Sequence, residues 1–118
     1  MSRLALAMLI CAPLASATFA DEIRLDAIAG LWKFPEKAVW IEIGKDGRLF
    51  QCRMGGNEVF VSRGRFQAPD QLVWDSYWGA ERVELTRSWL VVRGKTRPGV
   101  FARAHGPMSP ECQKQHDA

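Results

Sequence analysis

The sequence predicts an all-β protein in which a small antiparallel meander closes into a barrel of six to eight strands. Three observations predict this fold. Apolar and polar residues alternate with a period of two in short segments from Val39 onward. Turn-forming residues separate these segments at spacings of about 8–12 residues. No segment between Lys33 and Ala104 has a helical period long enough to connect parallel strands, so we expect neighbouring strands to be antiparallel.

The expected elements follow one another along the chain. Asp26 is placed to cap a short helical turn over residues 27–29. In the first strand, residues 39–43, every second residue is β-branched and apolar. Gly47 then offers the positive φ that a tight hairpin turn requires. Further strands are expected at residues 49–54, 58–65, 71–75, 82–86, 89–93 and 100–104.

The first twenty residues have the pattern of a cleavable signal peptide. Arg3 is their only charge, the run Leu4–Leu14 is almost wholly apolar, and small residues follow up to Ala20. The apolar run is shorter than the roughly 20 residues that span a bilayer. We expect cleavage after Ala20, with Ala17 as the second choice, and the alternative is a membrane anchor that stays in place. The predicted division is a signal peptide at 1–20, a β-barrel domain at 21–104 and an irregular C-terminal tail at 105–118.

The charge of the processed chain is close to balance. Cleavage after Ala20 leaves 98 of the 118 residues, enough for one small domain. Fifteen Lys and Arg and thirteen Asp and Glu remain, a net charge of +2. The basic residues are scattered among acidic ones, which gives no basis for binding nucleic acid or an acidic membrane surface. We therefore expect a periplasmic or secreted protein that does not bind nucleic acid and has no stable membrane span after processing.

Two cysteines remain after Cys11 leaves with the signal peptide. An even pair in an exported chain predicts a disulfide between Cys52 and Cys112. The bridge would close a loop of about 60 residues, for which chain entropy predicts about 4 kcal/mol of stabilisation. The alternative is two reduced thiols in a compartment that is not oxidising. Cys52 shares a strand face with Phe50 and Met54, so that face is either core or covered by the C-terminal tail.

Gly30-Leu31-Trp32 follows the expected helical turn and precedes the first expected strand. This placement resembles the Gly-x-Trp signature of lipocalin-like barrels. The resemblance implies that Trp32 packs across the closed end of the barrel. The length of the chain is similar to that of small lipocalin-like barrels of bacterial envelopes, among them periplasmic inhibitors of secreted metalloproteases. Cys112 departs from the pattern of those inhibitors, whose cysteines lie within the barrel.

Residues that carry catalysis or bind metals are scarce. The two histidines, His105 and His116, both lie in the C-terminal tail, and a metal site needs three or four convergent ligands. Asp75, Glu81 and Glu84 could form paired carboxylates, but Glu84 lies on the polar side of an alternating strand, which is typical of a solvated face. We expect no enzyme, no metal site and no cofactor.

The aromatic residues have two interpretations. Five tryptophans in a small domain are typical of core, because each aromatic buries about 150–250 Å². The alternative is a recognition surface. Trp40 and Phe60 lie on the strand faces opposite the β-branched residues, and Tyr77 and Trp78 lie in a loop where contact residues are common. These four are the candidate residues for binding a ligand or partner.

The function expected first is that of a non-enzymatic exported protein that binds a partner protein, or inhibits an envelope-directed hydrolase, through its loops. The alternative is a carrier or sensor of a small apolar ligand held inside the barrel. Size disfavours the carrier, because barrels of about eight strands are just wide enough for side chains to fill. Five tryptophans would occupy much of that space.

Overall fold

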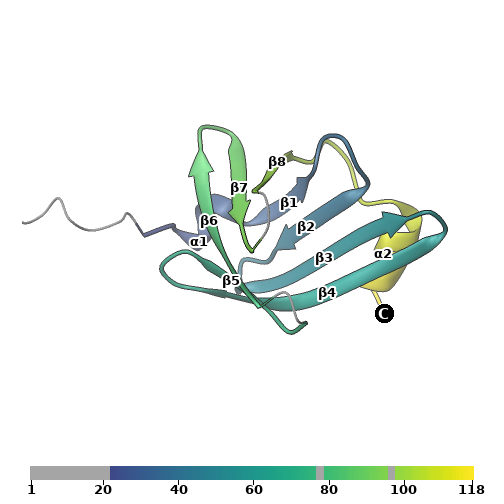
Figure 1. The fold of residues 1–118 in the computed structure, drawn as a ribbon, viewed down its shortest axis with the longest axis horizontal. Coiled ribbons are helices and arrows are strands. Elements are labelled where there is room, and N and C mark those ends of the chain that lie inside the picture. The colour runs from purple at the N-terminus through teal and green to yellow at the C-terminus, as the bar shows by residue number, and fades with distance from the viewer. Residues whose placement is uncertain (1–21, 77–78, 96–97) are drawn as a thin grey trace, which may run out of the picture.

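The structure, a computed structural model, describes residues 22–76, 79–95 and 98–118. Within these ranges eight antiparallel strands close into one barrel in the order of the sequence (Figure 1). The strands are β1 (Gly30–Lys33), β2 (Val39–Ile43), β3 (Arg48–Gly55), β4 (Glu58–Gln67), β5 (Gln71–Trp74), β6 (Ala80–Thr86), β7 (Trp89–Arg93) and β8 (Gly99–Arg103). Two short helices, α1 (Leu25–Ile28) and α2 (Pro110–His116), flank the strands along the chain. The predicted antiparallel barrel is confirmed.

One strand was not predicted. Gly30–Lys33 form β1, ahead of residues 39–43, the first expected strand, which is β2. β1 pairs with β2 on one side and with β8 on the other, and this pairing closes the barrel. Gly30 has a φ of +128°, which lets the chain pass directly from α1 into β1. A side chain at Gly30 would also meet the guanidinium of Arg103 at 2.7 Å. The glycine therefore allows the turn and leaves room for the guanidinium of Arg103.

The helical turn before β1 was predicted with the wrong cap. The helix begins at Leu25, and the N-cap residue Arg24 forms no side-chain capping hydrogen bond. Asp26 lies in the first turn, and its carboxylate pairs with the guanidinium of Arg24 at 2.9 Å. The main partner of the Asp26 carboxylate is therefore the guanidinium of Arg24, the N-cap residue.

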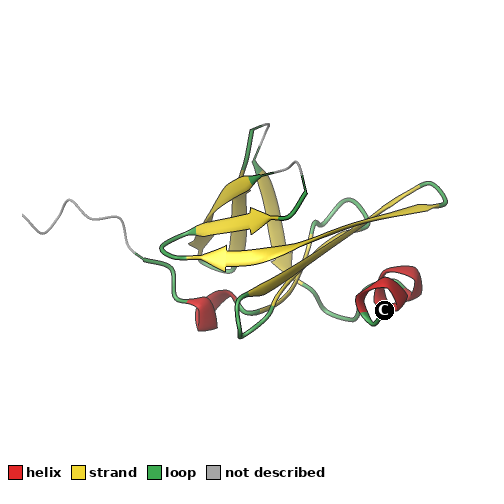
Figure 2. Cartoon of the chain, turned by 90° about the horizontal axis from the view of Figure 1, so that it is seen from below, coloured by secondary structure: helices red, strands yellow, loops and turns green. Residues whose placement is uncertain are grey.

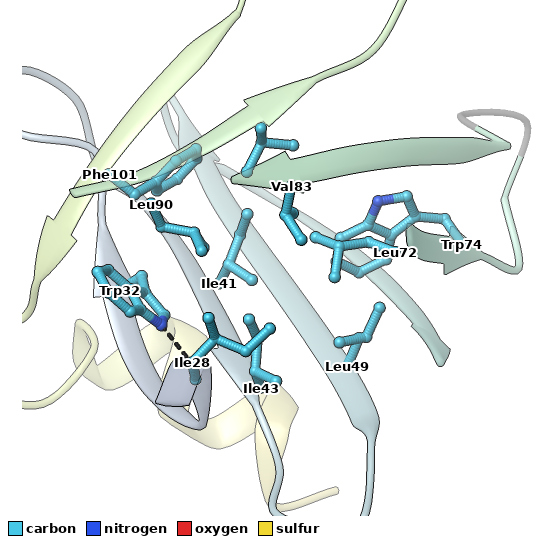
Figure 3. Packing of buried hydrophobic residues seen from close by; sticks show 11 residues of the cluster. Ile28, Trp32, Ile41, Ile43, Leu49, Leu72, Trp74, Val83, Leu90 and Phe101 are labelled. Atoms are coloured by element: carbon cyan, nitrogen blue, oxygen red, sulfur yellow. Dashed lines mark hydrogen bonds between the residues drawn. The ribbon is translucent and has the colours of Figure 1, made fainter. Parts of the chain in front are cut away.

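Alternation along the strands fills the interior of the barrel with apolar side chains. Figure 3 shows how they converge from opposite walls. Eleven buried residues form this inner core: Ile28, Trp32, Ile41, Ile43, Leu49, Leu72, Trp74, Val83, Leu90, Val92 and Phe101. Fully burying one such aliphatic or Phe side chain contributes about 1.5–3 kcal/mol, so this cluster is a main source of the stability of the domain.

The hairpin of β3 and β4 is longer than the other strands and extends past β5 (Figure 1). Gly64 marks the point where β4 leaves the barrel wall, because β4 pairs with β5 only from Gly64 onward. A Cβ at Gly64 would clash with the carbonyl oxygen of Val73 and with the Cα of Trp74. The glycine therefore lets the two strand backbones approach closely.

The prediction of an irregular C-terminal tail was wrong, because the tail contains helix α2. Ser109 is the N-cap, and its hydroxyl accepts a hydrogen bond from the backbone N–H of Cys112 at 3.3 Å. Pro110 follows in the first helical turn, where the missing N–H has no cost. The predicted disulfide between Cys52 and Cys112 is confirmed and anchors α2 beside the extended hairpin (Figure 2).

Helix α2 covers a second, outer core on the wall of the barrel. Its buried members are Trp40, Phe50, Cys52, Met108 and Cys112. Phe50 and Cys52 therefore lie outside the barrel and are covered by the C-terminal tail, which decides between the two alternatives left by the sequence. Among the described helices, none is long and apolar enough to cross a membrane.

Candidate functional site

Trp32 lies at the junction of α1, β1 and β8 and is fully buried. Its indole Nε1 donates a 2.8 Å hydrogen bond to the carbonyl oxygen of Ile28 in α1 (Figure 3). The guanidinium of Arg103 lies 4.1 Å from the centre of the indole ring and donates to the carbonyl oxygens of Ala29 at 2.6 Å and Ala27 at 2.8 Å. These contacts tie the first and last strands to α1. The barrel-closing role of Trp32 stays a prediction.

Trp40 does not lie on an exposed surface. It points to the outside of the barrel, as the alternation predicted, but only 6% of it is exposed. Its strand neighbour is Cys52, whose disulfide partner Cys112 brings α2 over it. Periodicity alone distinguishes the two faces of a strand, but it does not reveal that a distant segment covers one of them. Trp40 is therefore part of the outer core.

Phe60, by contrast, is 43% exposed, as expected for a surface residue. It lies on the extended part of β4, and the guanidinium of Arg53 on β3 sits 4.7 Å from the centre of its ring. A small hollow of about 30 Å³ lies beside it, lined also by Gln51 and Ser62. Within the part of the chain that the structure describes, the backbone on one side of this segment has no neighbouring strand, because β5 pairs with β4 only from Gly64 to Gln67.

The aromatic loop after β5 is only partly described. Tyr77 and Trp78, the other two candidate residues, lie outside the described residues. The loop starts beside β4: the hydroxyl oxygens of Ser62 and Ser76 are 3.4 Å apart.

A second exposed apolar surface lies where the loop between β1 and β2 meets β7 and β8. Trp89 is 42% exposed and Val100 is 40% exposed. A shallow groove of about 220 Å³, named the Trp89 groove, is lined by Phe34, Pro35, Glu36, Trp89, Pro98 and Val100. A large aromatic side chain beside two prolines and a valine offers a rigid apolar contact to a partner.

Trp89 was not among the predicted site residues. The pattern contained a usable indication, because Leu90 and Val92 point into the barrel and Trp89 therefore points outward. The contributions of the β1–β2 loop and of Pro98 could not be read from the strand pattern. Bringing those residues to Trp89 requires the closure of β1 onto β8.

A polar groove of about 490 Å³ runs between the outer barrel wall and α2. Its titratable lining contains both signs, three carboxylates and three guanidinium groups beside one imidazole: Glu42, Asp46, Asp75, Arg48, Arg63, Arg65 and His116. Several of these groups are already paired, since Arg63 donates to the carbonyl oxygen of Gln115 at 3.0 Å and Arg48 lies 3.5 Å from Asp46. This mixture favours no anionic or cationic ligand.

His116 is the titratable residue that holds α2 against the barrel. Its Nδ1 lies 3.0 Å from a carboxylate oxygen of Asp117, and its Nε2 contacts the carboxylate of Glu42 on β2. The edge of its ring meets Phe50, with the ring centres 5.0 Å apart. The hydrogen bond to Asp117, followed by that to Glu42, raises the pKa of His116 above its ordinary value of 6.5, against the effect of desolvation. The imidazole therefore serves as a contact between two elements.

Glu81 and Glu84, two of the three carboxylates considered for catalysis, are engaged in structural contacts. Glu81 accepts a 2.7 Å hydrogen bond from the indole Nε1 of Trp74. Glu84 lies on the outer face and pairs with Arg93 at 3.1 Å. Within the described ranges, no group of three or more His, Cys, Asp or Glu side chains is placed to hold a metal ion.

The comparisons with known proteins found no matching family, no similar curated protein and no similar solved structure. The exposed apolar surfaces at Trp89 and Phe60 therefore have to be interpreted from their own geometry.

Proposed function

We propose that this chain is an exported, non-enzymatic protein of the cell envelope that binds a partner protein through the Trp89 groove. The observation that carries the proposal is the contrast between a barrel interior filled by buried side chains and a large tryptophan left exposed outside it. Exposed apolar surfaces with a tryptophan at the centre are typical of protein contacts.

Two features support export to an oxidising compartment. Residues 1–20 have the composition of a signal peptide, with Arg3 ahead of the apolar run Leu4–Leu14. The disulfide between Cys52 and Cys112 suits the periplasm or the extracellular space, where such bonds persist. Export therefore explains both the apolar N-terminus and the cysteine pair.

We also propose that the chain is related to small lipocalin-like barrels. The support for this relation is Gly30-Leu31-Trp32 at the start of an eight-stranded antiparallel barrel. Inhibition of an envelope-directed hydrolase is one form that partner binding would take. The carrier alternative receives less support, because Trp32, Trp74 and Phe101 occupy the interior that a ligand would need.

The proposal is tested by chemical cross-linking of the processed protein in a periplasmic extract, followed by mass spectrometry. Trp89→Ser removes the exposed indole, and Phe60→Ser is the matched control because it removes another aromatic residue of similar exposure from a different element. We expect one partner to be recovered by the wild type and by Phe60→Ser. Its affinity for Trp89→Ser should be about 30-fold weaker, the usual cost of losing a central tryptophan.

Recovery of no partner, or of the same proteins by the wild type and Trp89→Ser, would contradict the proposal. Native mass spectrometry of the purified wild type addresses the alternative. A small apolar molecule retained at one copy per chain would favour the carrier.

A further inference from the structure

One edge of β4 is unpaired where the hairpin extends beyond the barrel. β4 pairs with β3 along the whole range from Glu58 to Arg65, but with β5 only from Gly64 to Gln67. Just before that point, the backbone N–H of Asp75 donates to the carbonyl oxygen of Arg63 at 2.8 Å. The segment Glu58–Ser62, named the β4 edge, has no strand beside it among the described residues. At its last residue, the hydroxyl oxygen of Ser62 lies 3.4 Å from that of Ser76 in the loop after β5.

The direction of the backbone groups along the β4 edge follows from two hydrogen bonds. The N–H of Phe66 donates to Gly47 on the β3 side, and the carbonyl oxygen of Arg63 accepts from Asp75 on the β5 side. Alternate residues of a strand direct their N–H and C=O to opposite sides. Val59 and Val61 therefore direct these groups outward, and no described residue bonds to them.

The residue types of the β4 edge favour pairing with another strand. Glu58-Val59-Phe60-Val61-Ser62 contains β-branched and aromatic residues, no proline, no glycine and one charge. Natural proteins usually protect such an edge by shortening it or by adding proline, lysine or a bulge. This segment has no proline, lysine or bulge, and Glu58 is its one charge. The outward groups, to which no described residue bonds, are available to an incoming strand.

We propose that the β4 edge is the contact through which two copies of this chain pair, antiparallel and related by a two-fold axis at Phe60. The proposal does not depend on the Trp89 groove. The sequence Val59-Phe60-Val61 reads the same in both directions, which suits a contact made by the same surface on both copies. In this register Val59 of each copy lies opposite Val61 of the other.

This register satisfies the outward backbone groups of both copies. The two Val59–Val61 pairs each exchange both N–H···O=C bonds, which makes four hydrogen bonds in all. Phe60 lies opposite Phe60 of the second copy in the non-hydrogen-bonded position, where side chains come closest. Glu58 faces Ser62 of the second copy, so no like charges meet directly.

The neighbouring registers are excluded by contacts within one chain. A two-fold axis at Val61 would pair Val59 with Arg63, whose carbonyl oxygen is already bonded to Asp75. An axis at Val59 would bring Ser62 opposite Gly56, which lies in the hairpin turn with a φ of +64°. The axis at Phe60 is the register in which all paired residues belong to the β4 edge.

The contact involves five residues from each copy, whereas a standard interface involves about 20–30 residues a side. We therefore expect a dimer that forms with rising concentration and dissociates on dilution. Sedimentation analysis of the processed wild type should show this equilibrium. If the protein stays monomeric throughout the concentration range used for NMR, the proposal is overturned. Binding of a strand from a different protein to the same edge would not rescue it, because the proposed partner is a second copy of this chain.

Hydrogen exchange of the wild type locates the contact without a mutation. The amides of Val59 and Val61 should gain protection as the concentration rises. The amides of Phe60 and Ser62 are the internal control, because they face β3 and should be protected at both concentrations. Concentration-dependent dimerisation with no change at Val59 and Val61 would place the dimer on another surface and overturn the proposal.

Single cysteines test the register. Phe60→Cys places two thiols opposite each other across the axis, with Cα atoms about 4.5 Å apart, so mild oxidation should give a covalent dimer. Ser62→Cys is the matched control and should cross-link far less, because Ser62 faces Glu58. Equal cross-linking of the two variants would contradict the register.

Val61→Pro removes an outward N–H that bonds to none of the described residues, and Val61→Thr is its conservative control. Dimerisation should be lost in the first variant and kept in the second, with far-ultraviolet circular dichroism showing that both fold. Because hydrogen exchange and cross-linking do not use Val61→Pro, a failure of that variant to fold would leave the proposal testable. Trp89→Ser should dimerise like the wild type, which separates this result from the proposed function.

Discussion

Arg103 connects the last strand to the helix that precedes the first. Its guanidinium lies over the ring of Trp32 and donates to two carbonyl oxygens at the end of α1. Arg103→Ala would leave both carbonyl groups without this donor and uncover one face of the indole. We expect the free energy of unfolding to fall by about 2 kcal/mol, given the usual cost of losing charged hydrogen bonds and a cation–π contact.

Urea unfolding followed by tryptophan fluorescence measures this loss. Arg24→Ala is the matched control, because Arg24 is an exposed arginine whose contact is an ion pair with Asp26. Its effect should be small, as for most surface ion pairs. If the two variants lost equal stability, the contact between Arg103 and α1 would not hold the barrel end.

His116 makes the attachment of α2 dependent on pH. The hydrogen bonds to Asp117 and Glu42 raise its pKa in the folded state above the ordinary value of 6.5. A group with a raised pKa contributes stability that is fully present below its unfolded pKa and lost as the pH rises through its folded pKa. His116→Gln should therefore destabilise the protein more at about pH 5.5 than at about pH 8.5.

The measurement is the difference in unfolding free energy between the wild type and His116→Gln at the two pH values. His105→Gln is the control for the loss of a histidine from the same tail, because His105 is exposed and makes none of these contacts. A destabilisation by His116→Gln that is the same at both pH values would show that the charged imidazole does not hold α2.

At the scale of elements, the disulfide and α2 act together. The bond between Cys52 and Cys112 spans 60 residues of sequence, for which chain entropy predicts about 4 kcal/mol. Replacing both cysteines with alanine should lower the stability by about this amount and release α2 from the outer core. Trp40 would then become exposed to solvent.

Quenching of tryptophan fluorescence by acrylamide reports this exposure. Quenching should increase in the double alanine variant, and it should increase less when Trp40→Phe is added. The wild type treated with a reductant under mildly denaturing conditions should behave like the double variant. Unchanged stability and unchanged quenching in the double variant would contradict the role given to α2.

The strands from β2 to β8 could be predicted because they have a period of two and turn-forming residues between them, whereas the four-residue β1 was missed. The expected segments at 39–43 and 89–93 match β2 and β7 residue by residue. Helix α2 was missed because its seven residues, which begin at Pro110, show no apolar period, and its stability comes from the Ser109 cap and the disulfide. The burial of Trp40 was missed for the same reason, since it depends on that helix.

The candidate surfaces were predicted only in part. The exposed face of Phe60 followed from alternation within one strand. The Trp89 groove joins three segments that are distant in the sequence, and the β4 edge exists because β5 is shorter than β4. Both depend on how strands of unequal length meet, which local patterns do not specify.

At the scale of the whole molecule, the same barrel wall separates two apolar clusters. The inner cluster fills the barrel beside α1, and the outer cluster lies under α2. Every strand from β1 to β8 contributes to the inner cluster except β4, which adds the partly buried Phe66. The large apolar side chains that remain exposed therefore lie on the outside of the barrel. A protein partner can cover them there, whereas a small ligand bound on this surface would bury little of its own apolar area.

A barrel filled in this way should not bind a small apolar ligand. Titration of the wild type with a fluorescent apolar probe should show no saturable binding, because eleven buried side chains occupy the interior. Leu90→Ala is the positive control: it removes a fully buried side chain, should cost about 2–5 kcal/mol and leaves an apolar cavity that a small probe can enter. Saturable binding of one probe per wild-type chain, with a change in the fluorescence of Trp32 or Trp74, would show that the interior opens. The carrier would then replace partner binding as the better supported function.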